Sequence, residues 1–198
     1  MNTNTRPFRV GVVGAGVMGR GIAQVMAQSG ADVLLHDAAE NAAGQAVEAV
    51  EQAWQKLAEK GRISDADAVA NRSRMRVAGS LDALSGCNVV IEAIVERLDA
   101  KRSLFAALED IVAADAVLAT NTSSLSVTAI AAACRHPARV AGLHFFNPVP
   151  LMRIVEIIGG VRTSPETLAT LDALVAATGH AGVRVQDTPG FLINHAGR

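Results

Sequence analysis

The sequence is poor in residues that several kinds of chemistry require. Among its 198 residues there is no tyrosine, and the only lysines are Lys56, Lys60 and Lys101. A mechanism that uses a tyrosine as the acid, or a lysine from the second half of this chain, is therefore excluded. The two cysteines, Cys87 and Cys134, lie far apart, without CxxC or metal-ligand spacing. We expect two reduced structural thiols and no metal site, as is usual in a cytoplasmic protein.

Strong net charge and long apolar runs are missing as well. The 18 basic residues nearly balance the 19 acidic ones, which argues against nucleic acid or an anionic membrane surface as partners. No run reaches the roughly 18 apolar residues of a membrane span, and the polar start MNTNTRPF lacks the apolar centre of a signal peptide. Because 50% of the residues are hydrophobic, we expect a globular, cytoplasmic protein with a large core that binds small molecules.

Short β-branched runs alternate with longer helical patterns along the chain. This alternation predicts an α/β fold with a doubly wound, mainly parallel sheet that is covered on both faces. A polar helical stretch over residues 38–74 interrupts it and is expected to form a helical excursion after the second strand. Its basic residues fit a phosphorylated ligand or a solvated face, and composition favours the solvated face. The predicted strands span residues 8–13, 32–36, 89–92, 117–120, 139–144 and 153–158.

A glycine loop directly follows the first predicted strand. Gly14, Gly16 and Gly19 have GxGxxG spacing at the start of a helical run, where they permit a tight turn, close approach of a pyrophosphate and close helix–strand packing. Asp37 ends the second strand about 20 residues further on, where a carboxylate accepts a hydrogen bond from a ribose 2′-hydroxyl. Because Ala38 follows instead of an arginine, the pattern indicates a Rossmann-type site that prefers NAD to NADP.

Three later strand ends are polar, in the segments 92–96, 121–124 and 144–147. Each has an ordinary structural explanation, because Asn and Ser often cap helices and Glu96 can be solvated. In a doubly wound sheet, however, ligands bind beyond the carboxyl ends of the strands. Together with the glycine loop, the three segments predict one site.

Glu156 lies within an aliphatic run that is expected to be a buried strand. An unpaired carboxylate there costs several kcal/mol, so it needs a partner. The connection from His144 is too short for a parallel crossover, which predicts antiparallel final strands. A reversal centred on Pro150 brings Glu156 opposite His144. Such a pair fits a dehydrogenase, in which histidine accepts the proton of the alcohol and the carboxylate orients the ring; a satisfied core histidine is the alternative.

Several motifs together resemble a known family. The glycine loop with its downstream Asp37, followed by IEAIVE, NTSSL, HFFNPVPLMRIVEII and DTPGFLIN, is similar to the NAD domain of the 3-hydroxyacyl-CoA dehydrogenases. The resemblance extends over nearly the whole chain. It implies NAD as cofactor, an acyl-CoA substrate, a place in fatty-acid β-oxidation, and reversible oxidation of an (S)-3-hydroxyacyl-CoA to the 3-oxoacyl-CoA.

The resemblance also implies roles for individual residues. His144 would be the general acid/base and Glu156 its orienting partner, with Ser123 and Asn194 near the reacting oxygen of the substrate. Lys60, Ser123 and Asn194 would bind the substrate, Lys60 through coenzyme A phosphates. The residues that would contact NAD are Gly14, Gly16, Val17, Met18, Gly19, Asp37, Ala93, Glu96, Lys101, Asn121, Ser123 and Asn147.

Two alternative functions stay open at this point. A gulonate-type sugar-acid dehydrogenase of the same family would use the same His and Glu, and a dinucleotide-binding module would bind without turnover. We expect residues 1–186 to form the NAD-binding domain and residues 187–198 to be a linker and the start of a C-terminal helical domain, with Thr188 and Pro189 opening a helix. Because family members continue into that domain, which forms most of a homodimer interface, we expect little activity from this chain alone.

Overall fold

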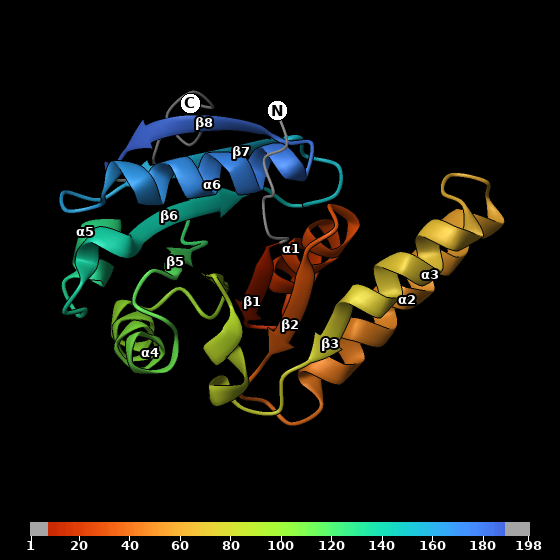
Figure 1. Cartoon of the computed structure of the whole chain (residues 1–198), viewed down its shortest axis with the longest axis horizontal. Helices are drawn as coiled ribbons and strands as arrows, with labels where there is room; N and C mark the ends of the chain where they lie inside the picture. The colour runs from red at the N-terminus through yellow and green to blue at the C-terminus, as the bar shows by residue number, and fades with distance from the viewer. Residues whose placement is uncertain (1–7, 189–198) are drawn as a thin grey trace.

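Eight strands form one sheet with helices on both faces in the computed structural model, which describes residues 8–188 (Figure 1). The strand order is β3-β2-β1-β4-β5-β6-β7-β8. The first six strands run parallel, β7 is antiparallel to β6, and β8 is parallel to β7. The strands are β1 (Arg9–Val13), β2 (Asp32–His36), β3 (Met75–Val77), β4 (Val89–Glu92), β5 (Val117–Thr120), β6 (Val140–Phe145), β7 (Ile154–Gly159) and β8 (Ala181–Gln186).

The helices follow the strands in the order that the alternation predicts. The excursion over residues 38–74 is a pair of helices, α2 and α3, that projects to one side of the sheet (Figure 1). The Rossmann-type doubly wound architecture, its helical excursion and its antiparallel final strands are thereby confirmed. The helices are α1 (Val17–Gln28), α2 (Ala42–Glu59), α3 (Asp65–Arg74), α4 (Leu98–Ile111), α5 (Val127–Ala131) and α6 (Pro165–Ala177), with short 3₁₀ segments η1 (Leu81–Gly86) and η2 (Pro137–Arg139).

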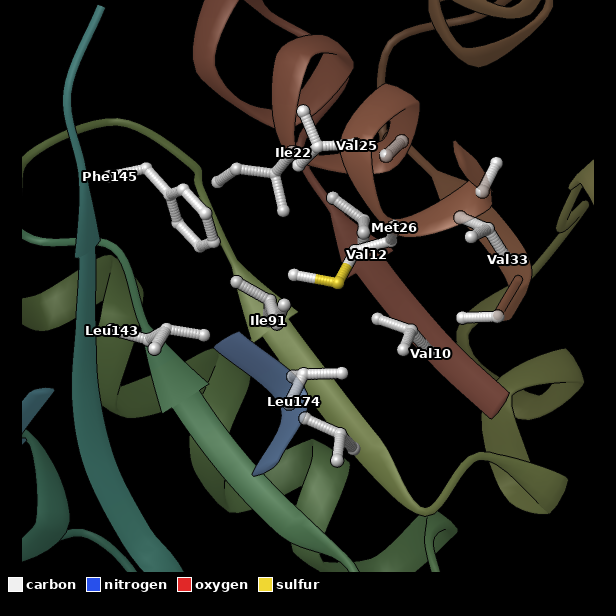
Figure 2. Packing of buried hydrophobic residues seen from close by; sticks show 14 of the residues in the cluster. Val10, Val12, Ile22, Val25, Met26, Val33, Ile91, Leu143, Phe145 and Leu174 are labelled. Atoms are coloured by element: carbon white, nitrogen blue, oxygen red, sulfur yellow. The ribbon is translucent and has the colours of Figure 1, made fainter. Parts of the chain in front are cut away.

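The central strands are apolar on both faces, because helices cover each side of the sheet. In β4, Val89 and Ile91 join the core beneath α1, α2 and α6, whereas Val90 joins the core beneath α4 and α5. Figure 2 shows part of the first core, in which Ile22 and Met26 of α1 pack near Ile91. This alternation follows from the two-residue period of a strand and explains why the strands are continuous hydrophobic runs.

Two strands, β3 and β8, were not expected from the sequence. Both lie at edges of the sheet. β3 has three residues, two of them exposed, and β8 has exposed or half-buried residues throughout. An edge strand buries little apolar surface, so the signal that identifies the central strands is weak there.

The carboxyl ends of the parallel strands meet at one edge of the sheet. Backbone hydrogen bonds join successive ends: Gly14 N–H donates to the His36 carbonyl, Ala93 N–H to that of Val13, and Asn121 N–H to that of Glu92, each at 2.8 Å. The segments that begin at these ends are thus held side by side. They carry most of the residues that the sequence singled out.

Candidate functional site

The glycine loop is shaped by two contacts that only glycine permits. Gly14 has φ +104°, and a Cβ there would lie 2.5 Å from the Ala93 carbonyl oxygen. A Cβ on Gly19 would lie 1.7 Å from the Gly14 carbonyl oxygen, so α1 could not approach the loop so closely. A Cβ on Gly16, by contrast, would meet no atom within 4 Å. The loop therefore presents open backbone at the N-terminus of α1, where free N–H groups favour an anion.

Asp37 lies beside this loop at the end of β2. Its carboxylate accepts hydrogen bonds from the N–H groups of Ala15, at 2.6 Å, and Ala39, at 2.8 Å. The side chain thus fixes the glycine loop in addition to its predicted contact with a ribose. The sequence indicated the ribose contact but not this bracing role.

Two hollows adjoin along this edge of the sheet. The first, of about 570 Å³, is mainly apolar and is lined by Gly14, Gly16, Asp37, Leu81, Ile94 and Leu104, among others. The second, of about 330 Å³, shares Ala93 and Ile94 with the first. Its lining includes Met18, Glu96, Asn121, Ser123, His144 and Asn147. The open glycine loop, the carboxylate and an apolar hollow of ligand size fit a dinucleotide extended from the first hollow into the second.

A third hollow, of about 470 Å³, lies between α2 and α3. Its walls carry acidic side chains such as Glu48, Glu51 and Glu59, and they include no predicted site residue. We assign the site to the two hollows beside the glycine loop.

His144 and Glu156 form a buried hydrogen-bonded pair. They are direct partners in the β6–β7 register, and Nδ1 of His144 lies 2.8 Å from a carboxylate oxygen of Glu156. Their side chains are 8% and 1% exposed, and the His144 ring also contacts the Phe146 ring. The carboxylate thereby has the partner that its burial requires, and its contact with Nδ1 fixes the orientation of the ring that lines the recess.

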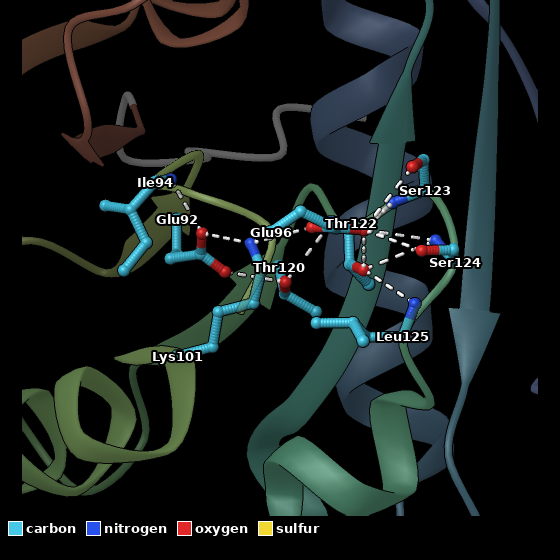
Figure 3. A network of polar contacts seen from close by, with 9 residues as sticks. All are labelled: Glu92, Ile94, Glu96, Lys101, Thr120, Thr122, Ser123, Ser124 and Leu125. Carbon is cyan, nitrogen blue, oxygen red and sulfur yellow. Dashed lines mark hydrogen bonds and ion pairs between the residues drawn. The ribbon is translucent and has the colours of Figure 1, made fainter. Parts of the chain in front are cut away.

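Glu96 holds the segment 121–124 in place (Figure 3). One of its carboxylate oxygens accepts from the Thr122 hydroxyl at 2.6 Å and from the Ser123 N–H at 2.9 Å. Burial alone would raise the pKa of Glu96, but the Thr122 hydrogen bond, the charge of Lys101 and the Ser123 N–H outweigh it, so this pKa lies below its ordinary value. Asn121 accepts from the Phe145 N–H at 2.8 Å and joins the segment to β6.

The comparisons with known proteins agree with this geometry. Residues 9–188 match the family described as 3-hydroxyacyl-CoA dehydrogenase, NAD binding domain. The chain belongs to this family. A probable 3-hydroxybutyryl-CoA dehydrogenase of Deinococcus radiodurans is 42% identical over 187 residues, which cover 94% of this chain and 67% of that protein. The 3-hydroxyadipyl-CoA dehydrogenase of Escherichia coli is 40% identical over 189 residues, which cover 96% of this chain and 40% of that protein.

Solved structures of the 3-hydroxyacyl-CoA dehydrogenase family have the same fold. The 3-hydroxybutyryl-CoA dehydrogenase of Escherichia coli superposes with a TM-score of 0.95 at 39% identity, over 98% of this chain and 41% of that one. The (S)-3-hydroxybutyryl-CoA dehydrogenase of Ralstonia eutropha gives 0.92 at 37% identity, over 96% and 67%. The chain thus spans between two fifths and two thirds of the length of these relatives. NAD is the cofactor of the matched domain, and the glycine loop and Asp37 fit it.

The remaining predicted residues of this family member lie in different places. Val17 is the first residue of α1 and is 59% exposed. Lys101 is buried, at 1% exposure, in ion pairs with Glu92 and Glu96, and its expected contact with NAD stays a prediction. Lys60 is exposed at the C-terminal end of α2 and lines neither of the two adjoining hollows. Asn194 lies outside the described residues.

Two residues of the dehydrogenase domain were missed in the sequence. Thr122 links Glu96 to the loop, and Asp187 accepts from the N–H groups of Val127 and Thr128 at the start of α5. Asp187 and α5 are about sixty residues apart in the sequence, so the local sequence around either one does not predict the contact. The DTPGF segment offered a signal only through the family resemblance.

Residues 8–188 offer little support for a cysteine nucleophile or for a metal site. Burial raises the pKa of Cys87 and of Cys134 to about 11, so neither thiol is a ready nucleophile. No cluster of three or more His, Cys, Asp or Glu side chains suited to a metal ion occurs in this range. Across the same residues, every helix is too short or too polar to traverse a bilayer.

Proposed function

We propose that the protein is the NAD-binding domain of a dehydrogenase that interconverts an (S)-3-hydroxyacyl-CoA and the 3-oxoacyl-CoA. The observation that carries this proposal is the His144–Glu156 pair, because the ring lines the same recess as Ser123 and Asn121, next to the glycine loop. The names of the relatives, which include 3-hydroxybutyryl-CoA dehydrogenases, support the substrate class.

In the oxidising direction, His144 removes the hydroxyl proton of the substrate through the ring nitrogen that does not face Glu156. NAD, held beside the glycine loop and Asp37, would supply the acceptor for the hydride that leaves C3. As the ring becomes an imidazolium, the Glu156 carboxylate stabilises its charge and keeps its orientation. In the reducing direction, protonated His144 and the Ser123 hydroxyl polarise the ketone, and His144 returns the proton to the oxygen.

The substrate-binding residues belong to the same proposal. Lys60 would meet coenzyme A phosphates from the exposed end of α2, and Asn194 would bind near the reacting oxygen. Assembly of the full-length enzyme as a homodimer through a C-terminal helical domain is likewise proposed. Each of these rests on the family resemblance.

Replacing His144 with glutamine tests the catalytic assignment. We expect kcat for acetoacetyl-CoA reduction to fall by about 10²- to 10⁴-fold, the range typical of a general acid/base, with little change in NADH affinity. His136, which is outside both hollows, provides the matched control as His136→Gln. Near-normal turnover in His144→Gln would refute the assignment.

NADH binding and turnover should be measured on this chain and on the same chain joined to the C-terminal portion of the Deinococcus radiodurans relative. We expect this chain to bind NADH with little turnover and the joined protein to reduce acetoacetyl-CoA. Turnover of gulonate but not of acetoacetyl-CoA would indicate the sugar-acid dehydrogenase. Binding without turnover in either protein would indicate a dinucleotide-binding module, and absence of NADH binding would overturn the proposal altogether.

A further inference from the structure

A buried ion pair is linked through Glu96 to the segment that carries Ser123. Lys101 of α4 is 1% exposed and Glu92 at the end of β4 is fully buried, and Nζ of Lys101 lies 2.6 Å from a carboxylate oxygen of Glu92. That same oxygen accepts from the Ile94 N–H at 2.7 Å, and the other accepts from the Thr120 hydroxyl at 2.7 Å. Glu92 therefore has donors on both oxygens and holds the Lys101 ammonium in a fixed place.

The ammonium also contacts a second carboxylate. Nζ of Lys101 lies 3.3 Å from one oxygen of Glu96, whose side chain is 37% exposed. The other oxygen of Glu96 faces the segment 121–124 and accepts from both the N–H and the hydroxyl of Ser123 and of Ser124, at 2.9 to 3.3 Å, besides the Thr122 hydroxyl. Figure 3 shows the chain of contacts from Glu92 through Lys101 and Glu96 to these residues.

Electrostatics make Lys101 the centre of this arrangement. It is the cation between two carboxylates, one of which has no access to solvent. Without it, Glu92 would be an uncompensated buried charge and would repel Glu96. With it, Glu96 stays ionised, and an ionised carboxylate accepts stronger hydrogen bonds from the N–H and O–H groups of the segment than a neutral carboxyl does.

We propose that Lys101, held by Glu92, is a positioning residue that fixes the carboxylate of Glu96 and, through it, the Ser123 segment beside His144. Its catalytic consequence rests on the proposed dehydrogenase function, whereas the positioning itself does not. This role differs from a direct contact with NAD, because the Lys101 side chain is almost fully buried and is not part of the lining of either hollow.

The two roles predict different kinetic effects. A residue that binds NAD directly lowers the affinity for NADH when it is removed. A residue that positions Ser123 lowers kcat instead, because misplacement of a catalytic group by about 1 Å can cost roughly 100-fold in rate. We therefore expect loss of Lys101 to reduce kcat about 10- to 100-fold, and any change in Kd for NADH to accompany a shift of the Ser123 and Ser124 signals, because Glu96 and Ser123 are themselves expected to contact NAD.

The test uses Lys101→Met and the double variant Glu92→Gln/Lys101→Met. Methionine keeps the apolar stem and removes the charge, and the double variant avoids leaving Glu92 unpaired, so it stays folded even if the single variant does not. Arg102→Met is the matched control, since Arg102 is an exposed cation next to Lys101 on α4. NADH affinity comes from fluorescence titration, and kcat from the joined protein described above.

The decisive measurement follows the amide NMR signals of Ser123 and Ser124 as a function of pH in this chain. Protonation of Glu96 weakens the hydrogen bonds that it accepts from both N–H groups, so these signals report the pKa of Glu96. Lys101 contacts Glu96 directly, and its loss makes the carboxylate harder to ionise. We expect the titration midpoint to move to higher pH in both variants and to stay unchanged in Arg102→Met.

A folded variant whose midpoint matches the wild-type one would overturn the proposal. So would a loss of NADH affinity with unchanged Ser123 and Ser124 signals, which would make Lys101 a direct cofactor ligand. These signals are independent of turnover. If the wild-type joined protein reduced no acetoacetyl-CoA, the proposed function would fail while the titration still decided the role of Lys101.

Discussion

His144 and Glu156 are directly opposed residues of the antiparallel pair β6–β7, and their side chains meet with 2.8 Å between Nδ1 and Oε2. β6 is the last strand that runs toward the site edge of the sheet, and β7 returns beside it. His144 lines the recess, and this return brings the buried carboxylate of Glu156 against its ring. His144 thereby gives the buried carboxylate of Glu156 a hydrogen-bond partner, and Glu156 fixes the orientation of the His144 ring.

Glu156→Gln tests whether Glu156 acts through His144. The amide keeps the size of the side chain but cannot stabilise an imidazolium, so we expect kcat to fall on the order of 10²-fold or more. Added to His144→Gln, the same change should have almost no further effect, because residues that act as a unit are not additive. Steady-state kinetics of the two single variants and the double variant form the cycle. Equal effects of Glu156→Gln in both backgrounds would contradict this dependence.

Replacement by alanine should weaken NADH binding at Gly16 and reduce the stability of the fold at Gly19. A methyl group on Gly16 meets no protein atom within 4 Å, so Gly16→Ala should leave the free energy of unfolding unchanged. It should weaken NADH binding by about tenfold or more, because the methyl occupies space that the pyrophosphate approaches. Gly19→Ala forces a clash with the Gly14 carbonyl and should destabilise the fold by about 1–3 kcal/mol. Urea unfolding and NADH fluorescence titration separate the two, and equal stability of both variants would count against this account.

Much of the fold could be predicted because its signals are local. Each central strand is a short apolar run between turn residues, and helix α6 begins at a local cap, because the Ser164 hydroxyl accepts from the Thr167 N–H. The edge strands β3 and β8 were not predicted, because they bury little apolar surface and carry polar or exposed residues. Their pairing depends on neighbours distant in sequence, which no local pattern records.

The site was predictable where chemistry and position coincide. Asp37 and the glycines have fixed spacing, and the buried position of Glu156 demanded a partner that the short reversal supplied. The burial of Lys101 was not predictable in the same way, since it depends on the carboxylates that surround the ammonium. Glu92 and Glu96 lie on different segments, and only the folded sheet edge brings both to one ammonium.

Asp37 should govern both the preference for NADH and the shape of the glycine loop. Asparagine offers one acceptor oxygen where two N–H groups, of Ala15 and Ala39, now donate to two. We expect Asp37→Asn to weaken NADH binding about 10- to 100-fold, the equivalent of one charged hydrogen bond, and to narrow the preference over NADPH because repulsion of a 2′-phosphate disappears.

Asp32→Asn is the control for this prediction, because Asp32 begins the same strand at its opposite end. Titrations with NADH and NADPH on both variants measure the two affinities. An unchanged ratio between the cofactors in Asp37→Asn would show that this carboxylate does not read the ribose.

Asp187 should stabilise the fold in a pH-dependent way. Burial alone would raise its pKa, but hydrogen bonds from residues 126–128 outweigh this, so the pKa in the folded state lies below the ordinary value. A carboxyl with a depressed folded pKa stabilises fully above its unfolded pKa, and this contribution is lost as pH falls through the folded pKa. Asp187→Asn should therefore cost about 1 kcal/mol near neutrality, as loss of a helix cap does, and progressively less below about pH 4.

Urea unfolding of wild type and Asp187→Asn from about pH 6 to about pH 2 measures this difference. Asp115→Asn serves as the control, because Asp115 is exposed and precedes β5 without a side-chain hydrogen bond among those found in residues 8–188. A constant difference across the whole range would mean that Asp187 acts by its shape alone. A difference that shrinks with falling pH would show that the charge of Asp187 ties the end of β8 to α5, the helix that follows the Ser123 segment.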